Sequence, residues 1–263
     1  MDEFLLHSIE SFPPLRESID QLNKLYRTEE VDTKALIKVI ESDPILYTDI
    51  LHFSNSPQYG FRHPISQISQ VIALFGQTTV RGMAIFAALK AHPFTDVKAY
   101  GITIEEWFAV MEKQQHFLTL WLGKTDRELI DSLVGLPFIL EIGRLVASYA
   151  LMFAHNPYRF TKTSTEELLM EEKNIIGSSG DELACRLFEL WFFDPAMVNA
   201  LRYSFSPSNG LNPKACAVLK CARTLFTLKS NEPFETILPI LETYSLDQKA
   251  ALSAYQTIIG VTV

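Results

Sequence analysis

The densest group of potentially reactive side chains is a run of glutamates that follows a histidine. Glu166, Glu167, Glu171 and Glu172, together with His155, have the donor types of a carboxylate-rich metal or acid–base site. A run of glutamates at a predicted helix start also complements the positive end of the helix dipole. The spacing therefore predicts a solvated helical face here rather than a site.

Serine and cysteine side chains offer no recognisable covalent chemistry. Ser132 and Ser148 lack the GxSxG elbow that exposes a nucleophilic serine, and the chain has neither a P-loop nor a Rossmann glycine pattern. Cys185, Cys216 and Cys221 are odd in number, lack CxxC spacing and lie among apolar residues. We therefore expect buried thiols in a reducing compartment, with no disulfide and no zinc site.

Charge and hydropathy limit the classes of partner. The 263 residues include 23 Lys and Arg against 31 Asp and Glu, a net charge of −8, and the cations are scattered. Binding to a phosphate backbone or an anionic lipid surface needs a local basic field. The first residues lack a cationic secretory leader, and the charge-free stretch 64–80 is interrupted by polar residues. The expectation is a cytoplasmic protein with no nucleic-acid partner and no membrane insertion.

The elements that position these residues are predicted to be helices. Asp43-Pro44, Asp194-Pro195 and Asn212-Pro213 each pair a capping residue with a proline suited to the first helical position. Between such caps the apolar residues recur with a period near 3.6. The predicted fold is an all-α multi-helix bundle with helices at 15–27, 32–41, 44–54, 66–75, 78–91, 104–122, 126–136, 138–153, 165–174, 181–193, 195–204, 213–229, 234–242 and 246–258.

The weakest periodicity lies between residues 91 and 103, where His92-Pro93 and Gly101 favour a loop. This predicts an N-terminal helical unit over residues 1–92 and a second helical unit over 104–263, joined in one compact domain. The last segment, 212–263, carries more apolar side chains than a free tail can leave exposed. We expect it to pack back on the core.

A series of motifs in the N-terminal unit has a characteristic order and spacing. It consists of Phe12-Pro13-Pro14-Leu15, Glu41-Ser42-Asp43-Pro44-Ile45-Leu46, Ile50-Leu51-His52-Phe53-Ser54-Asn55-Ser56, Tyr59-Gly60, Ile65-Ser66-Gln67-Ile68-Ser69-Gln70-Val71-Ile72-Ala73-Leu74-Phe75-Gly76 and Val80-Arg81. This series resembles the HDOD family, non-catalytic relatives of HD-domain phosphohydrolases in bacterial signalling. We place the resemblance over about residues 12–205, which implies an HD-like helical fold.

The motif residues also have local structural interpretations. Asp43 can cap the helix that Pro44 opens, Asn55 and Ser56 can end it, Ser66 can cap the next helix, and Gly76 can take the left-handed position after it. Arg81 lies near a helix start, where a cation gains nothing from the dipole. We expect it to pair with a buried carboxylate such as Asp43 or Asp49, or to face a partner protein. The motif set of structural or partner-contact residues is Asp43, Pro44, Asn55, Ser56, Gly76 and Arg81.

The resemblance implies a lost metal site. A working HD phosphohydrolase holds divalent cations with histidine and aspartate side chains that include an adjacent His-Asp pair. None of the six histidines is followed by aspartate. By ungapped matching Leu140 and Glu141 stand where that pair would be, Gly180 replaces a histidine, and Ser204 and Phe205 replace a His-His. We expect this relict HD pocket to have no metal, no catalytic residue and no cofactor.

The predicted function is therefore a non-enzymatic signal-transduction or regulatory module that acts by contact with a separate signalling protein, with a homo-oligomer as a further possibility. One alternative is a metal-dependent nucleotide or cyclic-dinucleotide phosphohydrolase with a rebuilt site. The other is a small-ligand sensor that uses the relict pocket without chemistry.

Overall fold

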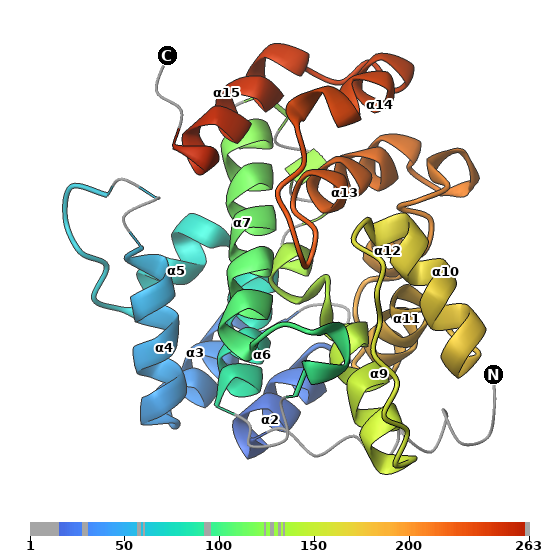
Figure 1. Ribbon diagram of the computed structural model, residues 1–263. Coiled ribbons are helices and arrows are strands. Elements are labelled where there is room, and N and C mark those ends of the chain that lie inside the picture. The colour runs from blue at the N-terminus through green and yellow to red at the C-terminus, as the bar shows by residue number, and fades with distance from the viewer. Residues whose placement is uncertain are drawn as a thin grey trace. The chain divides into compact units, whose positions relative to one another are not determined.

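A computed structural model places helices along the whole described part of the chain (Figure 1). It describes residues 16–27, 31–56, 59, 61–91, 96–123, 125, 126, 129, 130, 133 and 135–260. Within these ranges the all-α prediction is confirmed, and the one β-type pairing is an isolated antiparallel bridge between Phe226 and Asn231. The motif residues 12–15 and 60, and five residues of the predicted helix 126–136, lie outside the described residues.

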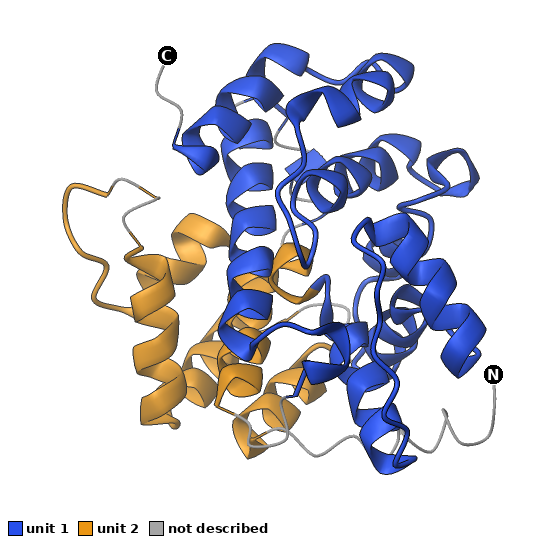
Figure 2. Ribbon diagram, in the orientation of Figure 1, with its two compact units in different colours: residues 1–12, 96–133, 140–263 blue, residues 13–95, 134–139 orange. Residues whose placement is uncertain are grey.

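The chain forms two compact units (Figure 2). Unit 2 comprises residues 13–95 and 134–139, and unit 1 comprises residues 1–12, 96–133 and 140–263. The segment 134–139, which the sequence analysis placed in the C-terminal unit, is thus grouped with the N-terminal helices.

Unit 2 is built around one buried helix. Its elements are α2 (Glu17–Leu25), α3 (Thr33–Glu41), α4 (Pro44–Ser54), α5 (Ile68–Phe75), α6 (Gln77–Lys90) and the 3₁₀ helix η3 (Leu136–Ile139). Every residue of α6 from Thr79 to Leu89 is buried, because α6 packs against α4, α5, α2 and η3. A Cβ atom at Gly82 would lie 2.4 Å from the carbonyl oxygen of Gly135, so this close approach of backbones requires glycine.

Unit 1 contains the remaining elements. They are η2 (Lys98–Tyr100), α7 (Ile104–Leu122), α9 (Ile142–Phe153), α10 (Thr165–Ile176), α11 (Gly180–Leu190), α12 (Pro195–Arg202), η4 (Pro207–Asn209), α13 (Pro213–Leu225), η5 (Phe234–Ile237), α14 (Leu238–Thr243) and α15 (Gln248–Ile259). The most extensive packing joins α11 with α9 and α15 with α7. At the first of these, a Cβ atom on Gly143 would lie 1.7 Å from the carbonyl oxygen of Gly180.

The C-terminal segment packs back on the core, as predicted. Leu225, Phe226 and Ile237 are fully buried. The indole N–H of Trp121 on α7 donates to the carbonyl of Asp247 at 3.0 Å, immediately before α15. This packing brings α13 against α7 and α12 inside unit 1.

Two predicted helices differ from the observed ones. The helix predicted over 138–153 is interrupted, because η3 ends at Ile139 and α9 begins at Ile142, which leaves Leu140 and Glu141 in the turn between them. The helix predicted over 213–229 ends at Leu225, where Phe226 turns into the bridge with Asn231. The first of these differences places Glu141 at a helix end rather than inside a helix.

The segment Leu136–Phe153 is long and apolar enough to span a membrane, but 83% of it is buried inside the fold. That burial is typical of a core helix.

Candidate functional site: a relict pocket filled by an arginine

The motif residue Asp43 caps α4, as predicted. Its carboxylate accepts hydrogen bonds from the backbone N–H groups of Ile45 at 3.2 Å and Leu46 at 3.1 Å, and Pro44 takes the first helical position. Ser18 Oγ donates to the same carboxylate at 2.8 Å, and Arg16 lies 3.4 Å away. Burial alone would raise the pKa of Asp43, but these donors outweigh it and hold that pKa below its ordinary value.

Asn55 ends α4 and also fixes the chain beyond it. Its side-chain amide donates to the carbonyls of Leu51 at 2.9 Å and Ile65 at 2.8 Å, and its carbonyl oxygen accepts from the Ile65 N–H at 2.7 Å. After the helix end, the backbone N–H of Ser56 donates to the carbonyl of Phe53. The expected cap by Ser66 is wrong, because α5 begins at Ile68 with Gln67 at the capping position and no side-chain cap.

Gly76 has the predicted positive φ but a different conformation. Its φ of +80° is paired with a ψ of 160°, an extended mirror-image conformation and not the left-handed helical one. Gly76 alone thereby separates the end of α5 from the start of α6. Side chains rarely adopt this conformation, so glycine is needed for the reversal.

Arg81 is fully buried inside unit 2, and the expected pairing with Asp43 or Asp49 is wrong. Its guanidinium donates to Asn23 Oδ1 at 2.8 Å and 3.3 Å and lies 4.3 Å from the centre of the Tyr26 ring. Burial lowers the pKa of Arg81 to about 10, with Tyr26 acting in the opposite direction. Asp43 binds Arg16 and Ser18 instead.

The relict pocket lies in unit 1 and centres on a residue that sequence reasoning did not single out. Arg223 of α13 is fully buried. Its Nε lies 3.1 Å from Glu141 Oε1, and its Nη1 lies 3.2 Å from Ser204 Oγ. The Phe205 ring centre lies 5.3 Å from the guanidinium carbon. Three of the five predicted pocket positions therefore meet around one guanidinium.

Asp181 supplies the second carboxylate. Its two oxygens accept from Arg223 Nη1 at 2.7 Å and Nη2 at 2.6 Å, a bidentate geometry that matches the planar guanidinium. Asp181 follows Gly180, one of the five predicted pocket positions. Neither Asp181 nor Arg223 was predicted, and the sequence of α13 gives no clear signal for Arg223, because this helix also carries Lys214 and Lys220.

Glu141 is held from several sides. Besides Arg223 it accepts a hydrogen bond from Gln114 Nε2 at 3.0 Å and forms an ion pair with Arg144 Nη1. Gln114 itself is tied to the Phe226 carbonyl at 2.8 Å. Leu140 is buried and aliphatic. Glu141, which the resemblance places at the position of the His-Asp pair, is thus committed to internal donors.

A third buried carboxylate, Glu172, adjoins this cluster and corrects the prediction of a solvated glutamate face. Glu172 is fully buried; it accepts from the Tyr100 hydroxyl at 2.9 Å and the Gly180 N–H at 2.5 Å, and lies 3.3 Å from Arg144 Nε. Burial raises the pKa of Glu172 above its ordinary value despite Arg144. Glu166 and Glu167 are exposed, as expected, and His155 does not join the cluster.

The residues present do not fit a divalent metal cluster. Leu140, Gly180 and Phe205 have no side-chain donor for a metal, and the Glu141 carboxylate is taken up by Gln114, Arg144 and Arg223. At Gly180 even a Cβ atom would lie 3.0 Å from Glu172 Oε2 and 3.2 Å from Arg144 Cγ, so a histidine side chain has no room. Over the described ranges, no group of three or more His, Cys, Asp or Glu side chains is arranged to hold a metal ion.

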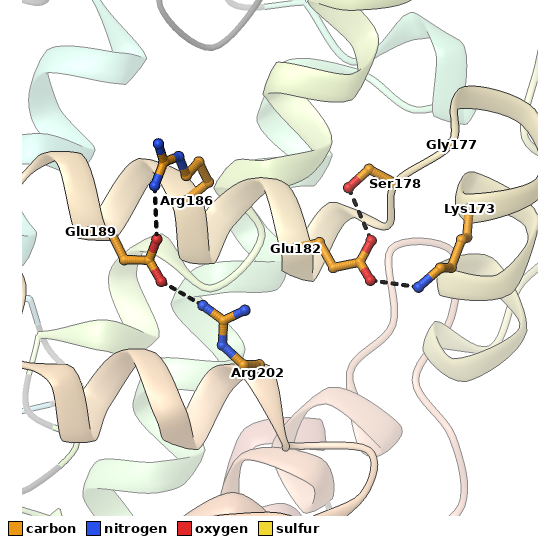
Figure 3. Close-up of a pocket in the computed structure, with 7 residues that line it drawn as sticks. All are labelled: Lys173, Gly177, Ser178, Glu182, Arg186, Glu189 and Arg202. Atoms are coloured by element: carbon orange, nitrogen blue, oxygen red, sulfur yellow. Dashed lines mark hydrogen bonds and ion pairs between the residues drawn. The ribbon is translucent and has the colours of Figure 1, made fainter. Parts of the chain in front are cut away.

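A groove of about 550 Å³ is lined by residues of α10, α11 and α12 and by the Gly177–Ser178 turn (Figure 3). The Glu182 carboxylate forms an ion pair with Lys173 Nζ at 2.6 Å and accepts a hydrogen bond from Ser178 Oγ at 3.0 Å. The Glu189 carboxylate forms ion pairs with Arg202 Nη2 at 2.5 Å and with Arg186 Nη1 at 3.4 Å. Both carboxylates of the groove are already paired with the cations around them.

Comparison with known proteins confirms the recognised resemblance in the N-terminal part. The family model of the HDOD domain matches residues 12–110. Residues 12–110 are therefore similar in sequence to the HDOD domain. The match ends well before residue 205, so the wider span of the sequence resemblance stays a prediction. No curated protein matches the chain.

Solved structures extend the likeness in fold beyond the HDOD domain. A virulence factor of Campylobacter jejuni is 24% identical over 99% of both chains, with a TM-score of 0.58. A putative phosphohydrolase of Shewanella amazonensis is 17% identical over 99% of this chain and 98% of its own, with a TM-score of 0.65. A putative signal transduction protein of Marinobacter aquaeolei is 17% identical over 98% of this chain and 62% of its own, with a TM-score of 0.63. At these identities the likeness is one of fold.

Proposed function

We propose that this HDOD protein is a non-enzymatic regulatory module of signal transduction that acts by contact with a separate protein. The observation that carries the non-enzymatic part is the commitment of Glu141. This acidic residue, at the position of the former His-Asp pair, is bonded to Gln114, Arg144 and Arg223 and is 2% exposed. A carboxylate held in this way is not free to position a metal-bound water.

The contact part of the proposal is supported by an exposed apolar surface within the HDOD domain. We name it the α5 patch and define it as Tyr59, Phe61, Leu74 and Phe75. Phe61 is 41% exposed and Leu74 is 55% exposed. Ring centres of Phe61 and Phe75 are 6.0 Å apart, and those of Tyr59 and Phe75 are 4.8 Å apart. Aromatic side chains of this kind anchor protein interfaces.

The two alternative functions, a phosphohydrolase and a small-ligand sensor, have less support. The phosphohydrolase alternative draws on the fold of the Shewanella protein, but a hydrolase here needs ligands that Leu140, Gly180 and Phe205 do not supply. A sensor that holds a small ligand in the relict pocket has to displace Arg223, which is fully buried between two carboxylates. The Marinobacter protein of the same fold, a putative signal transduction protein, favours the regulatory function.

The test is capture of the tagged chain from its own cells, with wild type beside a Phe61→Ser, Leu74→Ser variant. A Leu211→Ser variant is the matched control, since Leu211 is 80% exposed but lies in unit 1. We expect one protein, or a second copy of this chain, at near-equal amount with wild type and control, and its loss from the α5-patch variant. Equal recovery with all three would contradict the assignment to this patch.

Activity of the same preparations tests the non-enzymatic part. We expect no Mn²⁺-dependent hydrolysis of nucleotides or cyclic dinucleotides above that of a Glu141→Gln variant. Turnover that this substitution abolishes would establish the hydrolase instead.

A further inference from the structure

Arg223 reaches the relict pocket from outside the span of the sequence resemblance. It lies on α13, beyond residue 205, and its guanidinium is fully buried. The side chain therefore comes from the C-terminal segment to a place defined by Glu141, Ser204 and Phe205. Its own carbonyl is also fixed, by a hydrogen bond from Thr165 Oγ1 at 2.8 Å.

All three guanidinium nitrogens of Arg223 are used. Nε donates to Glu141 at 3.1 Å, Nη1 donates to Asp181 and to Ser204, and Nη2 donates to Asp181 at 2.6 Å. Glu141 precedes α9, Asp181 lies in the first turn of α11, and Ser204 follows α12. One cation thus binds oxygen atoms that three separate helices supply.

This arrangement performs the structural part of what a bound divalent cation does. Two buried carboxylates close to each other repel and are costly to bury unless a positive charge lies between them. A metal ion supplies that charge and ties its ligands together. Arg223 supplies this positive charge as part of the protein chain. Its planar guanidinium group also matches the geometry of the carboxylates.

We propose that the Arg223 guanidinium is a built-in cation that has taken the place of the metal in this HD-like pocket and ties α13 to α9 and α11. This goes beyond the proposed function, because it concerns what holds the helices of unit 1 together and does not depend on which partner the protein contacts. It also implies a latent site. A chain that lacks the Arg223 side chain has a cavity between Glu141 and Asp181 that accepts a free guanidinium ion.

The experiment uses Arg223→Ala with Phe188→Ala as the matched control. Both remove a large, fully buried side chain, but the Phe188 ring is apolar and its removal leaves no carboxylate without a cation. We expect the melting temperature of Arg223→Ala to fall by roughly 10 °C, the loss typical of breaking a buried ion pair. Millimolar guanidinium chloride, compared with equal sodium chloride, should raise that melting temperature and leave the melting temperature of Phe188→Ala unchanged. Equal responses of the two variants, or no response of either, would overturn the proposal.

A second comparison covers the case in which Arg223→Ala does not fold. Arg223→Met leaves Asp181 buried without its described cation and Glu141 paired only with Arg144, whereas Arg223→Met combined with Glu141→Gln and Asp181→Asn removes these three charges together. We expect the triple variant to melt well above the single variant, because the cost lies in uncompensated charge. A triple variant that melts no higher than Arg223→Met would show that Arg223 acts only by filling space.

Discussion

Asn55 makes two hydrogen bonds with the backbone of Ile65, donating to its carbonyl at 2.8 Å and accepting from its N–H at 2.7 Å. The side chain thus imitates a β-type pairing across the loop between α4 and α5. It keeps the ends of that loop together although ten residues separate them in sequence.

Asn55→Ala removes these two bonds and the one to Leu51. We expect it to lower the free energy of unfolding by about 1–3 kcal/mol, the range for partly buried hydrogen-bonding groups left without a partner. Urea unfolding followed by circular dichroism measures this. Asn55→Asp keeps the acceptor for Ile65 N–H and should lose less. Equal losses for the two variants would show that the acceptor contributes nothing.

Asp43→Ala removes the cap of α4 and should cost about 0.5–2 kcal/mol. Partner binding should stay intact once the variant is folded. Because the pKa of Asp43 is lowered in the folded protein, its contribution is present above the unfolded-state pKa and is lost as pH falls through the folded-state value. The stability difference between wild type and Asp43→Ala, measured by denaturation over the acid range, should therefore shrink toward low pH. A difference that is constant with pH would contradict a role for the charge.

The pH dependence of stability linked to Glu172 has the opposite sign to that linked to Asp43. Burial raises its pKa, so the folded state holds this proton more tightly than the unfolded state. Stability linked to Glu172 is then lost as pH rises from the ordinary glutamate pKa through the raised folded-state value. Glu172→Gln cannot titrate, and we expect its melting temperature to fall less steeply than that of wild type over this window. Parallel curves would show that Glu172 stays ionised throughout.

Gly143→Ala tests the close contact between α9 and α11. The added Cβ atom meets the backbone carbonyl of Gly180, which no side-chain rotation can relieve, so we expect a loss of about 3 kcal/mol or more. Gly101→Ala is the control, because its φ is +71° but no atom lies within 4 Å of the added methyl, and it should cost about 1–2 kcal/mol. Thermal unfolding of both variants measures the difference. A smaller loss at Gly143 than at Gly101 would contradict this packing.

Local features could be predicted from the sequence because their partners are near in the chain. Asp43, Asp194 and Asn212 cap the helices that follow them, and each cap depends on backbone groups two or three residues away. Ser66 is the exception; its N–H binds Gln70 Oε1 and the helix begins later than the pattern suggests.

Long-range electrostatics could not be predicted in the same way. Arg223 and Glu141 are 82 positions apart, and no periodicity links them. Glu172 and Glu171 are neighbours in a run that predicts a solvated face, yet Glu172 is buried beside Arg144, while Glu171 binds Thr161 and Lys162 N–H groups in the preceding loop. Helix rotation decides which glutamate enters the core, and tertiary packing fixes that rotation.

Calorimetric titration of Mn²⁺ into the wild-type protein, with Glu141→Gln as its partner experiment, tests most directly whether the relict pocket is closed to metal. We predict no stoichiometric binding of Mn²⁺ to the wild-type pocket and identical titration traces for the two proteins. Binding of one or two Mn²⁺ ions per chain that Glu141→Gln abolishes would contradict it, and would show that Arg223 leaves the pocket to admit metal.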